Sequence, residues 1–156
     1  MKIQNKSFVY LISPTKISNN NFFKYLELVF KSKKVSFFQL RLKNEKLSKK
    51  IIISKKIIKI CRKYKVKFLV NDDPILALKV NADGCHLGQK DMNIIKAKKI
   101  LKKIKKSINL PIVAIGGVNE KNYKKLLLNK ADFLAISGYI WKNRELEPYQ
   151  AIQRLK

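Results

Sequence analysis

The sequence is poor in acidic residues, in histidine and in cysteine, and each shortage narrows the possible functions. Ten acidic residues stand against 36 basic ones, a formal net charge of +26 over 156 residues. The single histidine, His86, and the two cysteines, Cys61 and Cys85, show no spacing typical of a zinc site or a disulfide framework. We therefore expect both thiols to be small buried hydrophobic side chains, and His86 to be packed rather than catalytic.

Long apolar runs are also missing. None approaches the ~18 residues of a membrane span. The short run from Phe8 to Ile12 is followed at once by Pro14 and Lys16, with no small-residue cleavage site. We interpret this run as a first β-strand rather than a signal peptide, and we expect a cytoplasmic protein with no membrane partner.

The positive charge is almost entirely lysine. Only Arg41, Arg62, Arg144 and Arg154 are arginine, whereas proteins that recognise specific nucleic-acid sequences rely on arginine forks. We interpret the lysines as solvated helix faces whose field attracts anionic substrates. We expect no specific nucleic-acid partner, although a basic nucleic-acid-binding protein is the non-enzyme alternative.

Short apolar strands alternate with amphipathic helices along the chain. Strands are predicted at 8–13, 37–42, 67–71, 85–87, 111–115 and 133–136, and helices at 21–31, 46–64, 74–80, 92–104, 119–128 and 148–155. Such alternation predicts an α/β domain over 1–156, with parallel strands and outer helices. Because a full eight-unit barrel usually needs at least about 200 residues, we expect an incomplete TIM-type (β/α) barrel of about six βα units.

Apolar and polar residues alternate from Phe38 to Lys43. The apolar set is predicted to face the helices and the polar set the inside of the barrel; the sets are Phe38, Leu40 and Leu42, and Gln39, Arg41 and Lys43. Two cations on the inside cost free energy unless an anion joins them. The pattern predicts a phosphate clamp; the alternative is a strand with one solvent-exposed face, as in antiparallel sheets.

Carboxylates follow the next two predicted strands. Asn71 and Asp72 end one strand, and Asp91 follows the other. Because strand ends meet at one rim of a barrel, the two carboxylates can face one cation, and Mg²⁺ typically takes one or two carboxylates plus phosphate oxygens. Either could instead be a turn or N-cap residue, the role we predict for Asp73 before Pro74.

Glycines end the last two predicted strands. Gly116 and Gly117 follow one, and Ser137 and Gly138 follow the other. Backbone N–H groups at such a turn into a helix bind phosphate, and the last two strands of a barrel often share a phosphate site. A simple turn would use the same residues.

Taken in order, these segments resemble the thiamine phosphate synthase family. The match comprises Tyr10-Leu11-Ile12, Gln39 to Lys43, Asn71-Asp72, His86 to Asp91, Ala114 to Gly117 and Ile136-Ser137. The resemblance implies a transferase of thiamine biosynthesis. Such an enzyme joins 4-amino-2-methyl-5-(diphosphooxymethyl)pyrimidine to a thiazole phosphate and releases diphosphate.

The resemblance also implies residue roles. Arg41 and Lys43 are the expected catalytic cations, and Asp72 and Asp91 the expected Mg²⁺ ligands. Substrate-binding roles are expected for Gln39, Leu40, Arg41, Leu42, Lys43 and Asn71 toward the pyrimidine diphosphate, and for Gly117, Ile136 and Ser137 toward the thiazole phosphate.

The sequence departs from the family between His86 to Asp91 and Ala114 to Gly117. Family members carry about two more βα units there, with a serine, a lysine and a threonine-rich loop that touch the substrates. We therefore expect a shortened synthase that is poorly active or inactive as a single chain, and that could form a homo-oligomer. The alternatives are the related thiazole tautomerase, which shares the fold, and a catalytically impaired remnant of the synthase.

Overall fold

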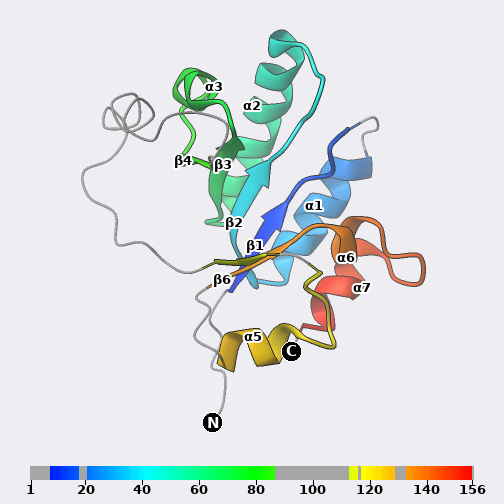
Figure 1. Cartoon of the computed structure of the whole chain (residues 1–156). Helices are drawn as coiled ribbons and strands as arrows, with labels where there is room; N and C mark the ends of the chain where they lie inside the picture. The colour runs from blue at the N-terminus through cyan, green and yellow to red at the C-terminus, as the bar shows by residue number, and fades with distance from the viewer. Residues whose placement is uncertain (1–7, 18–20, 87–112, 116, 129–132, 156) are drawn as a thin grey trace.

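The computed structural model describes residues 8–17, 21–86, 113–115, 117–128 and 133–155. Its strands are β1 Val9–Ile12, β2 Val35–Leu40, β3 Lys67–Asn71, β4 Gly84–His86, β5 Val113–Ile115 and β6 Phe133–Ile136. Its helices are α1 Asn21–Lys31, α2 Leu47–Lys63, α3 Pro74–Lys79, α5 Tyr123–Leu128, α6 Gly138–Trp141 and α7 Pro148–Gln153. The α/β alternation predicted from the sequence is confirmed (Figure 1).

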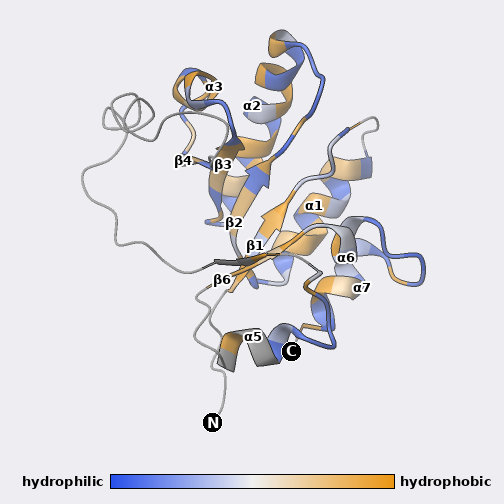
Figure 2. Cartoon of the chain, in the orientation of Figure 1, coloured by the Kyte–Doolittle hydropathy of each residue, from blue (hydrophilic) through white to orange (hydrophobic). Residues whose placement is uncertain are grey.

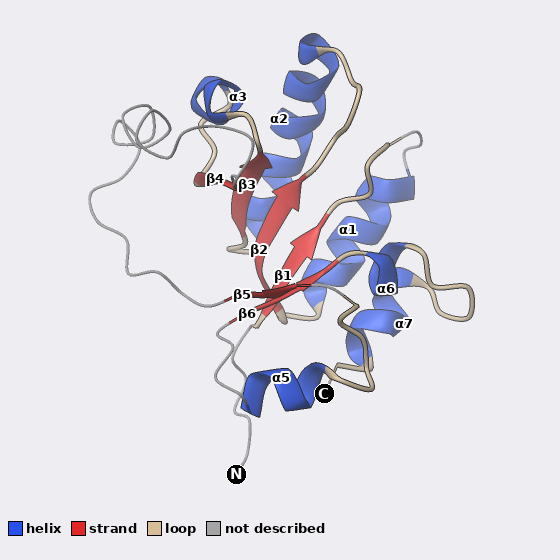
Figure 3. Cartoon of the chain, in the orientation of Figure 1, coloured by secondary structure: helices blue, strands red, loops and turns tan. Residues whose placement is uncertain are grey.

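The strands form one sheet in the order β4-β3-β2-β1-β6-β5, and every neighbouring pair is parallel. This order places the first strand beside the last one, because β1 lies between β2 and β6 (Figure 3). Within the described residues β4 and β5 are the outermost strands and do not pair with each other, so the barrel is open there.

Three predicted elements have the predicted bounds: α1, β3 and β6. The predicted strand 37–42 is shifted, since β2 begins and ends two residues earlier, at Val35 and Leu40. The predicted helix 119–128 begins only at Tyr123, because asparagine side chains bond the preceding backbone: Asn119 N–H donates to Asn122 Oδ1 and Lys121 N–H to Asn119 Oδ1, each at 2.9 Å. Helix α6 was not predicted, and the predicted helix 92–104 lies outside the described residues.

Most of the core lies between the sheet and its helices. Phe38 and Leu40 of β2 enter it together with Leu26 and Phe30 of α1 and Ile57 of α2. Figure 2 shows the corresponding apolar residues in the central strands and in stripes along α1 and α2. A second, small cluster lies on the opposite, inner face of the sheet and comprises Tyr10, Ile12, Ala135, Phe37, Leu69 and Phe133. The predicted facing of Phe38 and Leu40 toward the helices is therefore confirmed.

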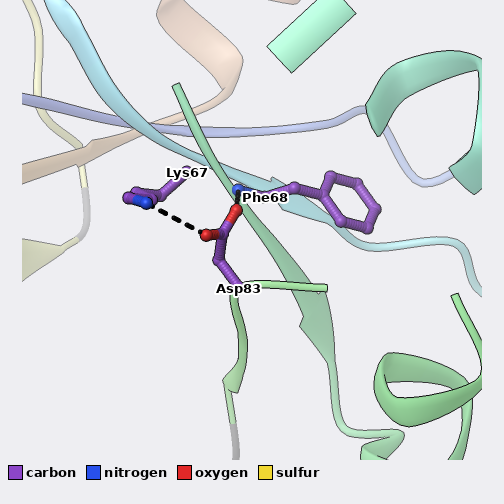
Figure 4. A network of polar contacts seen from close by, with 3 residues as sticks. All are labelled: Lys67, Phe68 and Asp83. Carbon is purple, nitrogen blue, oxygen red and sulfur yellow. Dashed lines mark hydrogen bonds and ion pairs between the residues drawn. The ribbon is translucent and has the colours of Figure 1, made fainter. Parts of the chain in front are cut away.

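The short strand β4 is held against β3 by Asp83. Asp83 Oδ2 accepts a hydrogen bond from Phe68 N–H at 2.9 Å, Oδ1 accepts one from Lys67 Nζ at 3.2 Å, and Asp83 N–H donates to the Phe68 carbonyl at 2.8 Å (Figure 4). Next to it, a Cβ on Gly84 would lie 2.8 Å from Leu69 Cδ2, so a larger residue would require the Leu69 side chain to move. These contacts hold the start of β4 against the start of β3, in the register that places Gly84 opposite Leu69.

The expectations for the thiols and the histidine are met fully for Cys61 and in part for Cys85 and His86. Cys61 is buried in the core, and desolvation by burial raises the pKa of its thiol. Cys85 is only half-buried; desolvation raises its thiol pKa to about 11. His86 is exposed at the outermost described strand on that side, although its ring lies edge-on to Tyr10 with the centroids 6.4 Å apart. Among the helices that the structure describes, none combines the length and the apolar character needed to cross a membrane.

Candidate functional site

A cleft of about 570 Å³ lies at the carboxyl ends of the strands. Its walls come from residues at or just after the ends of β1, β2, β3, β4, β5 and β6. Of the sequence-predicted site residues, the cleft brings together Gln39, Arg41, Asn71, Asp72, Gly117, Ile136 and Ser137. Residues at this edge come from distant parts of the chain, so only the parallel sheet places them around one space.

Gln39 and Arg41 form the β2 side of the cleft. Gln39 is 1% exposed, lies on the inner face of the sheet and donates from Nε2 to the Tyr10 hydroxyl at 3.2 Å. Burial raises the pKa of that hydroxyl, against a smaller lowering by the Gln39 bond, so Tyr10 stays neutral. Arg41 follows the strand and is half-buried in the cleft wall.

The predicted alternation fails at Lys43. Since β2 ends at Leu40, Lys43 is not held in strand geometry; it is exposed, its N–H donates to the Thr15 carbonyl at 3.2 Å, and it does not belong to the cleft lining. Leu40 is buried in the core on the helix side, and Leu42 packs against that core. Neither leucine side chain lines the cleft.

Asn71 and Asp72 form the β3 side of the cleft. Asp72 is exposed with a φ of 59°, and its N–H donates to the His86 carbonyl at 2.7 Å, which aligns the ends of β3 and β4. Asn71 Nδ2 donates to Asp72 Oδ2. Asp73 is the N-cap of α3, as predicted, with its Oδ1 accepting from Leu76 N–H at 2.8 Å.

Only one of the two predicted metal ligands, Asp72, lies within the described residues. Asp91 lies outside the described residues, and within them no three histidine, cysteine or acidic side chains cluster around one point. Asp72 offers one exposed carboxylate inside the cleft. That donor set fits Mg²⁺, which commonly combines one or two carboxylates with phosphate oxygens and water.

Gly117, Ile136 and Ser137 form the opposite side of the cleft. Gly117 has a φ of 58°, a conformation that favours glycine, and a Cβ added there would have no heavy atom within 4 Å, so its role is conformational. Its carbonyl accepts from Asn119 Nδ2 and Asn122 Nδ2, each at 3.0 Å. Gly116, also predicted at this turn, lies outside the described residues.

The cleft also contains residues that the sequence pattern did not indicate. Ser13, Tyr139 and Lys142 line it, and the exposed Lys142 adds a second cation on the Ser137 side. Tyr139 donates to Glu120 Oε2 at 3.2 Å, and desolvation followed by the Glu120 charge raises the pKa of Tyr139 to about 12. None of these residues is part of a recognisable motif, so only their place in the fold reveals them.

Helix α6 is anchored directly to β1. Trp141 Nε1 donates to the Ile12 carbonyl at 2.7 Å, and the Trp141 ring packs against the Phe22 ring with centroids 5.2 Å apart. The anchor keeps Ser137 and Lys142, at the two ends of α6, beside the end of β1. The wall opposite Arg41 and Asp72 is thus built on a fixed element.

Comparison with known proteins agrees with this geometry. A family model described as thiamine monophosphate synthase matches residues 9–103. Thiamine-phosphate synthase of Pelagibacter ubique is 52% identical over 201 residues, covering 97% of each chain. That alignment is longer than the 156-residue chain, so the relative has residues without a counterpart here. The predicted shortening is thereby confirmed, although its place in the chain stays a prediction.

Two solved structures share the fold. Thiamine phosphate pyrophosphorylase from Pyrococcus furiosus matches with a TM-score of 0.81 at 23% identity, covering 99% of this chain and 96% of that one. The corresponding protein from Bacteroides thetaiotaomicron matches with a TM-score of 0.67 at 12% identity, covering 95% of both chains. The TIM-type fold class predicted from the sequence is confirmed, with the barrel open in the described residues. With its family-model match and its Pelagibacter relative, the chain belongs to the thiamine monophosphate synthase family.

Proposed function

We propose that this chain binds a pyrimidine diphosphate and a thiazole phosphate in the cleft and joins them to thiamine phosphate, releasing diphosphate. The observation that carries the proposal is the convergence of seven predicted site residues on one cleft at the carboxyl ends of the strands. The names of the Pelagibacter relative and of the matching family support the same reaction.

The proposed pyrimidine diphosphate subsite is the β2–β3 side of the cleft. Arg41 supplies a fixed positive charge for the diphosphate, and Asn71 an amide that can bond its oxygens. Gln39 is buried and already bonded to Tyr10, so its amide is oriented before the ligand arrives. An amide held in this way suits the hydrogen-bonding edge of a pyrimidine ring.

Asp72 would hold Mg²⁺ together with oxygens of the diphosphate, and Asp91 is proposed as its second ligand. Bound Mg²⁺ supplies charge neutralisation at the leaving diphosphate. Arg41 acts on the same charge from the β2 side, since a cation already in place stabilises negative charge as it develops. Lys43 is a weaker candidate than the sequence indicated, because it stands outside the cleft.

The proposed thiazole phosphate subsite is the opposite side. Gly117, Ile136 and Ser137 line it at the ends of the last two strands, where backbone N–H groups would bind the phosphate, and Lys142 adds a cation. The attacking group is a ring nitrogen with a free electron pair, so the bond forms without prior loss of a proton. The cleft must therefore align the two substrates and stabilise the leaving group, rather than supply a base.

Turnover by the single chain is proposed to be weak. Residues present in the Pelagibacter relative are missing here, and misplacement of a substrate by about 1 Å can cost about 100-fold in rate. The outermost strands β4 and β5 expose unpaired backbone groups within the described residues, which favours pairing with a second copy. Both proposed substrates are charged metabolites, which is consistent with a cytoplasmic enzyme.

The test is a thiamine phosphate assay on purified protein, with calorimetry for each substrate separately and light scattering for the mass in solution. We expect both substrates to bind, with turnover well below that of a full-length synthase assayed in parallel. Failure to bind either substrate would refute the proposed function. Full turnover by a monomer would instead refute the proposed need for the missing residues.

A further inference from the structure

Ser13 lies where the two proposed subsites meet. It follows β1 directly, is 2% exposed and lines the cleft between Arg41 and Ser137. Ser13, Gln39 and Ser54 are the buried polar residues of the part that the structure describes, and hydrogen bonds offset the hydration that such a group loses. The bonds that Ser13 makes therefore indicate its role.

The Ser13 hydroxyl replaces a backbone group in the sheet. Ile12 lies opposite Gln39, and Ser13 N–H donates to the Gln39 carbonyl at 2.9 Å, as a regular parallel ladder requires. The next bond of that ladder would run from Arg41 N–H to the Ser13 carbonyl. Instead, Arg41 N–H donates to Ser13 Oγ at 2.9 Å. The side chain thus replaces one bond of the ladder, which resumes where Lys43 N–H donates to the Thr15 carbonyl at 3.2 Å, and it fixes the backbone of Arg41.

This exchange leaves the Ser13 carbonyl available to the other side of the cleft. Ser137 Oγ donates to it at 3.4 Å, a long bond that joins the residue after β6 to the residue after the neighbouring β1. The Ser13 hydroxyl itself donates to the Pro14 carbonyl at 2.8 Å. Since its donor and an acceptor site are already used within the protein, the hydroxyl acts through its neighbours rather than on a ligand.

We propose that Ser13 is a positioning residue that holds Arg41 and Ser137 in register, and so couples the pyrimidine diphosphate subsite to the thiazole phosphate subsite. This inference rests on the proposed function, because Arg41 and Ser137 matter to ligands only if the cleft binds them. It assigns to one buried serine the alignment of two substrates that bind on opposite walls.

Ser54 provides a matched control. It is fully buried in α2, and within the described residues its hydroxyl has no hydrogen-bond partner. Replacing either serine by alanine removes one buried hydroxyl, but only the change at Ser13 alters the bond to Arg41. A general effect of losing a hydroxyl from the core would appear in both variants.

The experiment measures the Kd of each substrate by calorimetry for the wild type, Ser13→Ala, Ser13→Thr and Ser54→Ala. We expect Ser13→Ala to weaken both substrates by about three- to tenfold, the range of one ordinary hydrogen bond. Ser13→Thr, which keeps the hydroxyl, and Ser54→Ala should bind like the wild type. In an Arg41→Ala background, Ser13→Ala should not weaken pyrimidine diphosphate binding further, because it acts through Arg41.

Hydrogen exchange of the Arg41 amide gives a readout that needs no variant. In the wild type this amide should be protected although it lies beyond the last residue of β2. An unprotected Arg41 amide, or equal Kd values for Ser13→Ala and the wild type, would overturn the inference alone. Absence of binding by the wild type would overturn the proposed function, and this inference with it.

Discussion

Replacing Arg41 by alanine should weaken pyrimidine diphosphate binding more than the loss of any lysine on a helix surface. A hydrogen bond to a charged group contributes about 1.5–3 kcal/mol, which corresponds to roughly 10- to 150-fold in Kd. Because Arg41 is half-buried and partly screened by water, we expect the lower part of this range, about tenfold. The loss should depend only weakly on ionic strength, since a direct contact is screened less than a distant one.

The assay is calorimetric titration of pyrimidine diphosphate with Mg²⁺, at low and at physiological salt. Lys55→Ala is the matched control, because Lys55 is an exposed cation on α2 and lies outside the cleft. It removes one positive charge and should change Kd less than twofold, the scale of an exposed charge. Equal losses of affinity for Arg41→Ala and Lys55→Ala would show that the anion is bound by the overall net charge of +26 and not by the cleft.

Lys43→Ala distinguishes the structure from the sequence pattern. The alternation from Phe38 to Lys43 predicts that Lys43 contributes as much as Arg41, whereas its exposed position outside the cleft predicts a smaller effect. We expect Lys43→Ala to cost clearly less than Arg41→Ala in the same titration. A larger loss of affinity for Lys43→Ala than for Arg41→Ala would mean that the Lys43 side chain enters the cleft when the ligand is bound.

Three further predictions concern the metal, a glycine and the thiols. Pyrimidine diphosphate should bind only when Mg²⁺ is present, so that EDTA or Asp72→Asn raises its Kd. Equal Kd values with and without EDTA would contradict the proposed metal site. Gly117→Ala should lower the free energy of unfolding by about 1 kcal/mol, because φ is 58° there. Gly138 has no positive φ, so Gly138→Ala should not lower the free energy of unfolding in the same denaturant titration. At pH 8 the native protein should react slowly with a thiol reagent, because the pKa of the half-buried Cys85 is raised to about 11 and Cys61 is buried. Cys85 should be labelled first, and labelling of Cys61 before Cys85 would contradict this prediction.

Most of the secondary-structure elements and the family could be predicted from the sequence alone. The bounds of α1, β3 and β6 follow from patterns within a few neighbouring residues: an apolar stripe of helical period in α1, and apolar strands that end in asparagine or before Ser137. Helical bonds join residues four apart, so their signal is local. Gln39, Arg41, Asn71 and Asp72 could be selected for the same reason, since polar residues at the ends of buried strands are visible along the chain.

The end of β2 and the full lining of the cleft could be seen only in the tertiary structure. The polar alternation continues to Lys43, but β2 ends at Leu40, where the hydroxyl of Ser13, just after β1, takes the Arg41 N–H bond that a regular ladder gives to a carbonyl. The same holds for Lys142, which enters the cleft because Trp141 anchors α6 to β1. Strand register and cleft walls depend on hydrogen bonds between segments more than 100 residues apart, such as Trp141 to Ile12, and no local pattern contains that information.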